Sequence, residues 1–326
     1  MKFLWDNLMN FKKPKFWDYK KPNFFAYLLF PITLLLTLNN LLLKIYPKKK
    51  FNEIKTICVG NIYLGGTGKT PTTLKLFELL KGLNLNIATA KKNYSYQQDE
   101  EILLKKKSNL IISKKRSDII AKAIKKGIDL VIFDDGLQEK KVDYDVKFVC
   151  FDCKSWIGNG FLIPSGPLRE KIKSLMKYDG VFLKSSIKDF NSSEISSKIK
   201  NINPEIEIFN SYVLIKNINK FDLSNKFIIF SGIGNAYSFK ETLVNNNFNI
   251  TKEIVFPDHH EYKLEEISKI LNFAKKEKAE ILTTEKDYVK IPENLKDKIN
   301  YIEIDLEIEE KDKLINLIKT KINETY

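Results

Sequence analysis

The segment from Gly65 to Thr70, GGTGKT, has the residue types that a phosphate-binding loop needs. Glycines let the backbone come close to a phosphate, a lysine reaches the β- and γ-phosphates of a nucleotide, and a threonine hydroxyl can ligate Mg²⁺. A helix is expected to begin at the end of the segment, and its N-terminus adds positive field there. We therefore predict nucleotide contacts from the loop residues Tyr63, Leu64, Gly65, Gly66, Thr67, Gly68, Lys69 and Thr70.

One position departs from the strict phosphate-loop pattern, which begins with a glycine where this chain has Tyr63. The alternative is a glycine-rich turn that is followed by Lys and Thr by chance. An apolar run, IKTICVG, precedes the loop, and a helical pattern follows it. This order of strand, loop and helix favours the phosphate-binding interpretation.

Two adjacent carboxylates, Asp134 and Asp135, end a second apolar run, LVIFDDGLQ. A phosphate-loop fold places a carboxylate for Mg²⁺ at the end of a strand near the loop. We expect the strand to lie beside the one that leads into the loop, so that Asp134 or Asp135 faces the metal. A capped strand end is the alternative. Thr70 and Asp134 are predicted to organise Mg²⁺, directly or through water.

Three more predicted strands end in polar or glycine-rich segments, which are SGIGN (231–235), PDHH (257–260) and TTEKD (283–287). Strand ends of this kind share one edge of a parallel sheet, so we expect all three to face a cleft between two lobes. His259 and His260 are the two histidines of the chain, and they follow Asp258. For each histidine, a structural role is the alternative to a catalytic one.

Arg169, in the segment PSGPLRE, is one of two arginines in the chain. Its guanidinium would suit a phosphate or a sugar that carries acyl carbonyls. An ordinary turn is the alternative.

The elements that would position these residues alternate between strands and helices. Short unbroken apolar runs indicate a parallel sheet that is covered on both faces, and the alternation indicates an α/β fold. Strands are predicted at 54–60, 86–90, 109–112, 129–133, 226–230, 250–256 and 280–283, and helices at 70–80, 100–107, 118–126, 237–245 and 264–275. The stretches 191–203 and 205–215 are interpreted as a connector between two lobes.

The longest apolar run, FFAYLLFPITLLLTLNNLLLKI, covers residues 24–45. As a helix it would extend about 33 Å, which is close to the hydrocarbon thickness of a bilayer. It contains Pro31 and two asparagines, and lysines crowd both of its flanks. Three interpretations stay open: a transmembrane helix, a helix in the membrane interface, and a buried helix of a soluble domain. In the first two, the lysines would bind anionic lipid.

The net charge of +14 comes almost entirely from lysine. Lysines that simply fill solvated positions are the alternative to an anionic partner. The aromatic and zinc-binding signatures of nucleic-acid recognition are absent from the sequence, so we predict no nucleic-acid partner. The three cysteines fit a reduced compartment, and the pair Cys150 and Cys153 lacks the further ligands of a zinc site.

The order of VGN, GGTGKTP, DDGLQ, GNG, PSGPLRE, SGIGN, PDHH and TTEKD along nearly the whole chain resembles the tetraacyldisaccharide 4'-kinase family of lipid A biosynthesis. The resemblance implies a P-loop NTPase-type parallel sheet domain, a second smaller α/β lobe and an N-terminal membrane-associating helix. It implies transfer of the ATP γ-phosphate, with Mg²⁺, to the 4'-hydroxyl of tetraacylated glucosamine disaccharide 1-phosphate. It also implies that the protein is located at the inner membrane and contacts the membrane lipid, with the catalytic lobes on the cytoplasmic face.

The resemblance also implies roles for particular residues. In QQDEE, Asp99 matches the catalytic aspartate and Glu100 falls on a metal-associated position, while His259 matches the catalytic histidine. The family motifs that hold Asn61 and Arg169 suggest substrate contacts for both residues. Upstream of Asp99 the chain reads AKKNYSYQQDE, which is shorter than the SRGYG-containing loop of the family and lacks its glycines.

The expected mechanism divides these residues between two lobes. Lys69 and the loop amides hold the phosphates, Asp99 takes the proton of the acceptor hydroxyl, and His259 orients Asp99 or shares the proton. Asp135 would support the metal or the histidine.

The division expected along the chain is a membrane-associating segment (1–50), a P-loop kinase domain (51–205) and a second lobe (206–326). A membrane-associated P-loop switch ATPase is the rival hypothesis. Leu64 stands where many such switches carry a lysine, which counts against it.

Overall fold

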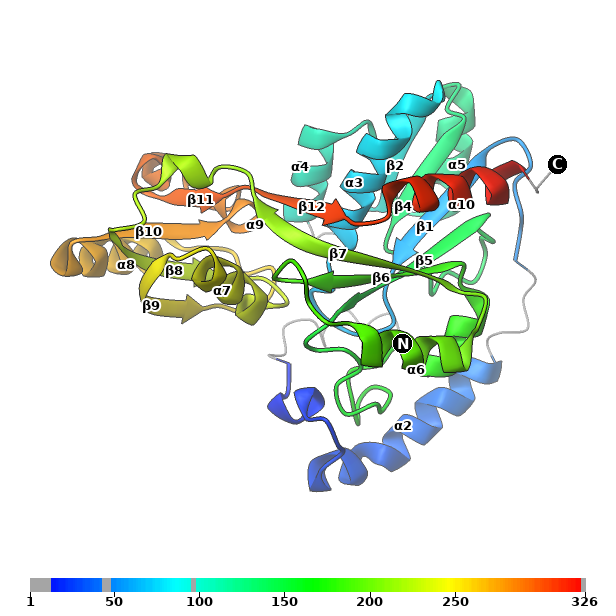
Figure 1. Ribbon diagram of the computed structural model, residues 1–326, viewed down its shortest axis with the longest axis horizontal. Coiled ribbons are helices and arrows are strands. Elements are labelled where there is room, and N and C mark those ends of the chain that lie inside the picture. The colour runs from blue at the N-terminus through cyan, green and yellow to red at the C-terminus, as the bar shows by residue number, and fades with distance from the viewer. Residues whose placement is uncertain (1–12, 43–47, 95–97, 324–326) are drawn as a thin grey trace.

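The computed structural model describes residues 13–42, 48–94 and 98–323, and arranges them as two α/β lobes, with the smaller lobe at the left of Figure 1. The larger lobe is built on an eight-stranded sheet in the order β12-β7-β6-β5-β1-β4-β2-β3. Its strands are β1 (Lys55–Gly60), β2 (Ile87–Lys92), β3 (Leu110–Ser113), β4 (Leu130–Asp134), β5 (Val146–Asp152), β6 (Gly180–Ser185), β7 (Glu207–Ile215) and β12 (Ile304–Ile308).

All neighbours in this sheet are parallel except β12, which pairs antiparallel with β7. The central strands β1 and β4 are almost wholly buried, as unbroken apolar runs predict. Helices α3 (Lys69–Leu80) and α10 (Lys311–Asn323) pack on one face, and α5 (Arg116–Lys125) and α6 (Ser193–Ile202) on the other. The predicted parallel sheet with both faces covered is confirmed.

The smaller lobe has a four-stranded parallel sheet in the order β11-β10-β8-β9. Its strands are β8 (Lys226–Ser231), β9 (Asn249–Val255), β10 (Ala279–Thr284) and β11 (Asn300–Ile302). Helix α8 (Leu264–Glu277) covers one face and α7 (Ala236–Asn245) the other, while the short α9 (Glu285–Tyr288) follows β10 directly.

The stretch between the lobes differs from the predicted connector. Residues 193–202 form α6, and residues 207–215 form β7, a strand inside the larger sheet. The chain leaves for the smaller lobe after β7 and returns as β12, so these two strands lie side by side where the lobes join (Figure 1). The strand pairing therefore assigns both β7 and β12 to the larger lobe, although we placed the boundary between residues 205 and 206. A nonlocal pairing between β7 and β12 leaves no local signal in the sequence.

The N-terminal apolar run forms α2 (Phe24–Leu42), and the end of the predicted helix, residues 43–45, lies outside the described residues. Ala26 and Thr33 face the protein, where the Thr33 hydroxyl makes a 2.8 Å hydrogen bond with the Ser165 hydroxyl. The other faces of α2 expose large apolar side chains, such as Leu28, which is 62% exposed, and Leu35, which is 69% exposed. Among the described residues, no helix has both the length and the apolar character needed to cross a membrane.

Candidate active site

The phosphate loop connects β1 to α3, and its conformation explains its glycines. Gly68 precedes α3 with φ of 87°, in the left-handed region that L side chains rarely adopt. A Cβ on Gly66 would lie 3.1 Å from the Cβ of Asn235, which belongs to the SGIGN segment of the smaller lobe. The loop is thus folded as predicted at the start of a helix, and it lies directly against the second lobe.

The first half of the loop is tied to the segment that follows Phe161. The Leu64 amide donates to the Pro167 carbonyl at 2.8 Å, and the Arg169 amide donates to the Ile62 carbonyl at 2.7 Å. The Tyr63 hydroxyl donates to Asp18 at 2.5 Å, at the end of the 3-10 helix η1 (Lys15–Asp18). Through these hydrogen bonds, Tyr63 and Leu64 stabilise the first half of the loop.

Asn61 has a different place from the substrate contact that we predicted. Its side chain is fully buried, and its amide donates to the carbonyls of Tyr63 at 2.5 Å and Gly65 at 3.3 Å. Because the side chain is enclosed by the loop, its position supports the loop backbone and does not present Asn61 to an acceptor.

Thr70 and Asp134 meet at the end of β4, as the sequence predicts. The register pairs Val59 with Asp134, and the Thr70 hydroxyl donates to Asp134 Oδ2 at 2.9 Å. The other oxygen, Oδ1, is buried without a hydrogen-bond partner among the described residues. Burial raises the pKa of Asp134, although Lys91 lowers it. A divalent cation would reverse such a shift, because it stabilises the carboxylate.

These two side chains fit Mg²⁺ that is bound together with a nucleotide. Mg²⁺ in kinase sites takes one or two carboxylates and completes its shell with phosphate oxygens and water. The orphaned Asp134 Oδ1 and the Thr70 hydroxyl supply oxygens of the required kind. Within the described ranges, no three His, Cys, Asp or Glu side chains gather in a group that could hold a metal ion by itself.

Glu100, the third predicted metal ligand, is held by two lysines. Its Oε2 lies 2.5 Å from Lys91 Nζ, and its Oε1 lies 3.1 Å from Lys286 Nζ. Lys91 also contacts Asp134 at 3.1 Å, so one ammonium pairs with both carboxylates. Both lysine pKa values are raised: burial lowers them, and the neighbouring carboxylates more than offset that effect.

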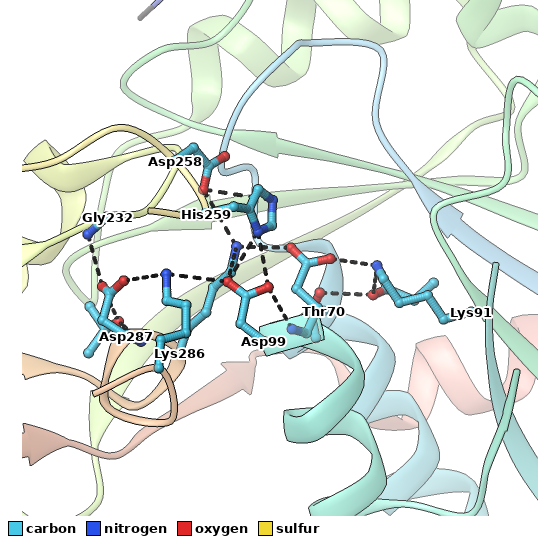
Figure 2. Close-up of polar contacts among 12 residues, drawn as sticks. Thr70, Lys91, Asp99, Gly232, Asp258, His259, Lys286 and Asp287 are labelled. Carbon is cyan, nitrogen blue, oxygen red and sulfur yellow. Dashed lines mark hydrogen bonds and ion pairs between the residues drawn. The ribbon is translucent and has the colours of Figure 1, made fainter. Parts of the chain in front are cut away.

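Asp99 and His259 are brought together from different lobes. Asp99 lies in the first turn of α4 (Gln98–Lys107), and His259 follows β9. His259 Nδ1 lies 3.0 and 3.1 Å from the two oxygens of Asp99, which is 2% exposed (Figure 2). Burial raises the pKa of Asp99, but the hydrogen bond from His259 and the charge of Lys286 lower it more, so the net shift is downward.

The smaller lobe fixes His259 through the segments that the sequence singled out. The His259 amide donates to the Gly232 carbonyl at 3.1 Å, and the Gly232 amide donates to Asp287 at 3.1 Å. Asp287 is fully buried and also accepts from the Thr284 hydroxyl at 2.7 Å. SGIGN, PDHH and TTEKD therefore meet at one edge of the smaller sheet, which confirms the expected shared edge, while a cleft at this edge stays a prediction.

Two lysines beside Asp99 were not predicted as site residues. Lys286 Nζ lies 3.6 Å from Asp99 and 3.6 Å from Asp258, and Lys290 Nζ lies 3.6 Å from Asp99 and 2.9 Å from Asp287. Lys286 belongs to the TTEKD segment, which the sequence already singled out as a polar strand end. The sequence gives no reason to choose Lys286 as a site residue over the many other lysines of the chain.

The carboxylate of Asp135 pairs with Arg169. The carboxylate lies 3.4 Å from Arg169 Nη1, which also donates to Gln138 at 3.3 Å. Burial raises the pKa of Asp135, but the charges of Lys69 and Arg169 hold it well below its usual range. Asp135 and Arg169 thus form a pair. Support of the histidine was one of the two roles that we predicted for Asp135, and the structure shows a contact with Arg169 in its place.

His260, Cys150 and Cys153 contact other parts of the fold and have no contact with Asp99 among the described interactions. His260 stacks on Phe256 and contacts Glu266 at 3.0 Å. Cys150 and Cys153 are both buried free thiols. The place of His260 agrees with the structural alternative for the histidines, and the burial of Cys150 and Cys153 gives them a place in the core.

Comparison with known proteins assigns the family. The model of LpxK, tetraacyldisaccharide-1-P 4'-kinase, matches residues 25–323. A tetraacyldisaccharide 4'-kinase of Pelagibacter ubique (strain HTCC1062) is 44% identical over 318 residues, which cover 97% of this chain and 99% of that protein. Another, from Rickettsia akari (strain Hartford), is 34% identical and covers 92% of this chain and 94% of its own.

A solved structure supports the fold independently. The crystal structure of LpxK from Aquifex aeolicus in complex with ATP has a TM-score of 0.65 and 22% identity, covering 91% of this chain and 99% of that one. Together with the matches along the sequence, this agreement in fold leads to one conclusion: the chain belongs to the tetraacyldisaccharide-1-P 4'-kinase family.

Proposed function

We propose that this kinase transfers the γ-phosphate of ATP to the 4'-hydroxyl of a tetraacylated glucosamine disaccharide 1-phosphate. The observation that carries the proposal is the contact of Asp99 with His259 across the two lobes. A continuous series of polar contacts joins it to the phosphate loop, from Asp99 and its neighbour Glu100 through Lys91 and Asp134 to Thr70. This series supports the proposal that Asp99 acts as a base near the group to be transferred.

The phosphate end of the site works by position and charge. Lys69 and the amides at the start of α3 would bind the β- and γ-phosphates, and Thr70 and Asp134 would hold Mg²⁺, which neutralises the charge that develops on the transferred group. The side-chain carbons of Lys184 lie close to Gly68, and its ammonium is paired with Asp152 at 3.0 Å. This packing would restrict the backbone of the loop at Gly68.

The acceptor end of the site needs a base, because a sugar hydroxyl is a weak nucleophile at neutral pH. Asp99 would accept the hydroxyl proton, since its lowered pKa keeps it ionised. His259, Lys286 and Lys290 hold Asp99 in place and keep its charge compensated. Asp135 and Arg169, which pair beside the loop, would orient the acceptor and the metal-bound phosphates.

We also propose that the enzyme works at the inner membrane, with its catalytic lobes on the cytoplasmic side where ATP is available. The support is the exposed apolar surface of α2, which includes Phe24, Phe25, Leu28, Leu34, Leu35 and Leu38. Such a helix can lie in the membrane interface, where the acyl chains of the acceptor also lie. The three buried, unpaired cysteines agree with a reduced compartment. The absence of a nucleic-acid partner stays a prediction.

A transfer assay tests the reaction. The full chain in detergent is mixed with Mg-ATP and tetraacyldisaccharide 1-phosphate, and mass spectrometry measures the lipid. We expect a gain of one phosphate on the non-reducing sugar, with loss of that gain in Asp99→Asn while ATP binding persists. ATP hydrolysis with an unchanged lipid would favour the switch-ATPase hypothesis instead, which family membership already disfavours.

A vesicle assay tests the membrane proposal. Phe25→Ser/Leu28→Ser/Leu35→Ser should weaken co-sedimentation with vesicles of phosphatidylglycerol and phosphatidylethanolamine. Met176→Ser/Val244→Ser, which removes exposed apolar side chains on other elements, is the matched control and should bind as the unaltered chain does. Equal binding by both variants would place the membrane contact elsewhere.

A further inference from the structure

Lys91 is a buried ammonium at the centre of the site. It lies on β2, is 1% exposed, and is among the largest fully buried side chains of the described chain. Burying a charge is costly unless it is paired. Its pairing is close on both sides, with Glu100 Oε2 at 2.5 Å and Asp134 Oδ2 at 3.1 Å.

Of the two carboxylates, Asp134 is buried and Glu100 is partly buried, and a divalent cation commonly takes a place between two such groups. Here a lysine holds that place, and a lysine ammonium is a compact point charge that can compensate both oxygens. The second oxygen of Glu100 is paired with Lys286 at 3.1 Å, while the second oxygen of Asp134 has no hydrogen-bond partner in the described chain. The two carboxylates are therefore not equivalent: Asp134 has an oxygen to offer, and Glu100 has both engaged.

We propose that Lys91 is a positioning residue which replaces a metal ion between Asp134 and Glu100. Glu100 then serves as the counter-ion of Lys91 and Lys286 instead of as a metal ligand. Asp134 Oδ1 and Thr70 retain a divalent ion only when nucleotide phosphates complete its shell. This inference rests on the proposed nucleotide site but not on the identity of the acceptor, so it can fail or succeed independently of the lipid reaction.

Binding of Mn²⁺ to the nucleotide-free full chain tests the proposal, with free Mn²⁺ measured by electron paramagnetic resonance. The unaltered chain should bind weakly. Lys91→Met removes the ammonium that Asp134 and Glu100 share, while Lys286 stays paired with Glu100. The affinity of this variant for Mn²⁺ should therefore rise at least about tenfold, which corresponds to about 1.4 kcal/mol. Mn²⁺ should also raise the melting temperature of this variant, because a ligand of the folded state stabilises it.

Two variants serve as controls. Lys91→Met/Glu100→Gln removes one of the carboxylates and should lose the gain in affinity. Lys92→Met changes the neighbouring lysine, which stacks on Tyr94, and should bind Mn²⁺ as the unaltered chain does. Equal Mn²⁺ affinity of Lys91→Met and the unaltered chain, or a gain that persists in the double variant, would overturn the proposal.

A measurement on Glu100→Gln keeps the test decisive if Lys91→Met does not fold. With a non-hydrolysable ATP analogue present, Mn²⁺ affinity of Glu100→Gln should stay within about twofold of the unaltered chain, because a counter-ion is not a ligand. Loss of a metal ligand costs far more, since changes even behind the ligands typically reduce affinity about 10- to 100-fold. A tenfold loss would return Glu100 to the metal.

Discussion

The phosphate loop and the Asp99–His259 contact are both polar sites at the ends of strands, but they are built in opposite ways. The loop is made by one continuous segment between β1 and α3, with the neighbouring strand β4 adding Asp134. The Asp99–His259 contact joins α4 of the larger lobe to the smaller lobe, and its two residues are 160 positions apart in the sequence. The first depends on backbone geometry and the second on compensated charge, so substitutions should affect them differently.

The largest expected effect is at the loop. Lys69→Met should reduce phosphate transfer about 1,000-fold or more, because a charge that acts on the transferred phosphate has no substitute. Lys81→Met, at the exposed C-terminal end of α3, is the matched control and should keep full activity. Radiolabelled transfer and nucleotide binding measure the effect. Normal transfer by Lys69→Met would remove the phosphate-loop assignment.

The difference between a contiguous loop and a contact between distant residues also explains what could be predicted from the sequence. The loop, Thr70 and Asp134 follow from contiguous patterns, and the structure joins them as expected. The family resemblance identified Asp99 and His259 as partners, and the structure brings them together, although their roles stay predictions. The lysines around Asp99 and Asp134 were not predictable, because a chain so rich in lysine gives no local reason to select Lys91, Lys286 or Lys290.

One end of the larger sheet shows the same limit. β7 and β12 belong to one sheet although the whole smaller lobe lies between them in the sequence. Their pairing depends on packing with neighbours that sequence patterns do not reveal.

The adjacent histidines allow a matched comparison within the second site. His259→Gln removes the contact with Asp99 and should lower kcat about 100-fold, in the range of general acid–base contributions. His260→Gln removes the contacts with Phe256, Tyr262 and Glu266 and should change kcat less than about threefold. Steady-state kinetics measure both variants. Equal losses would mean that the smaller lobe is merely destabilised, which thermal unfolding would reveal.

The pH dependence of stability tests the charge of Asp99. Its pKa is lowered from 3.8 in the folded state, so its ionised form stabilises the fold. This contribution is fully present above the unfolded value and is lost as the pH falls through the lowered folded value. The free energy of unfolding lost in Asp99→Asn should therefore be constant from about pH 5 to 8 and shrink below about pH 4.

Urea unfolding at several pH values measures this difference. Asp118→Asn, at an exposed position of α5, is the control and should show little loss at any pH. A loss for Asp99→Asn that grows on acidification would contradict the lowered pKa. The same ionisation predicts that Asp99 causes no fall in kcat/KM above about pH 5.

The smallest effect is expected at the edge of the lobe contact. Glu285 of α9 pairs with Lys106 at 3.4 Å and with Lys107, both on the helix that carries Asp99. The lysines are 59% and 33% exposed, while the Glu285 carboxylate is 7% exposed, so each pair meets solvent through its cation. Taking about 0.2–1 kcal/mol for a pair with a solvated cation, Glu285→Gln should lower kcat/KM by at most about fivefold. About 0.5 M KCl should reduce the difference, because salt screens the solvated lysines. A loss of about 100-fold would show that the peripheral ion pairs, and not the buried charges around Asp99, hold the two lobes in register.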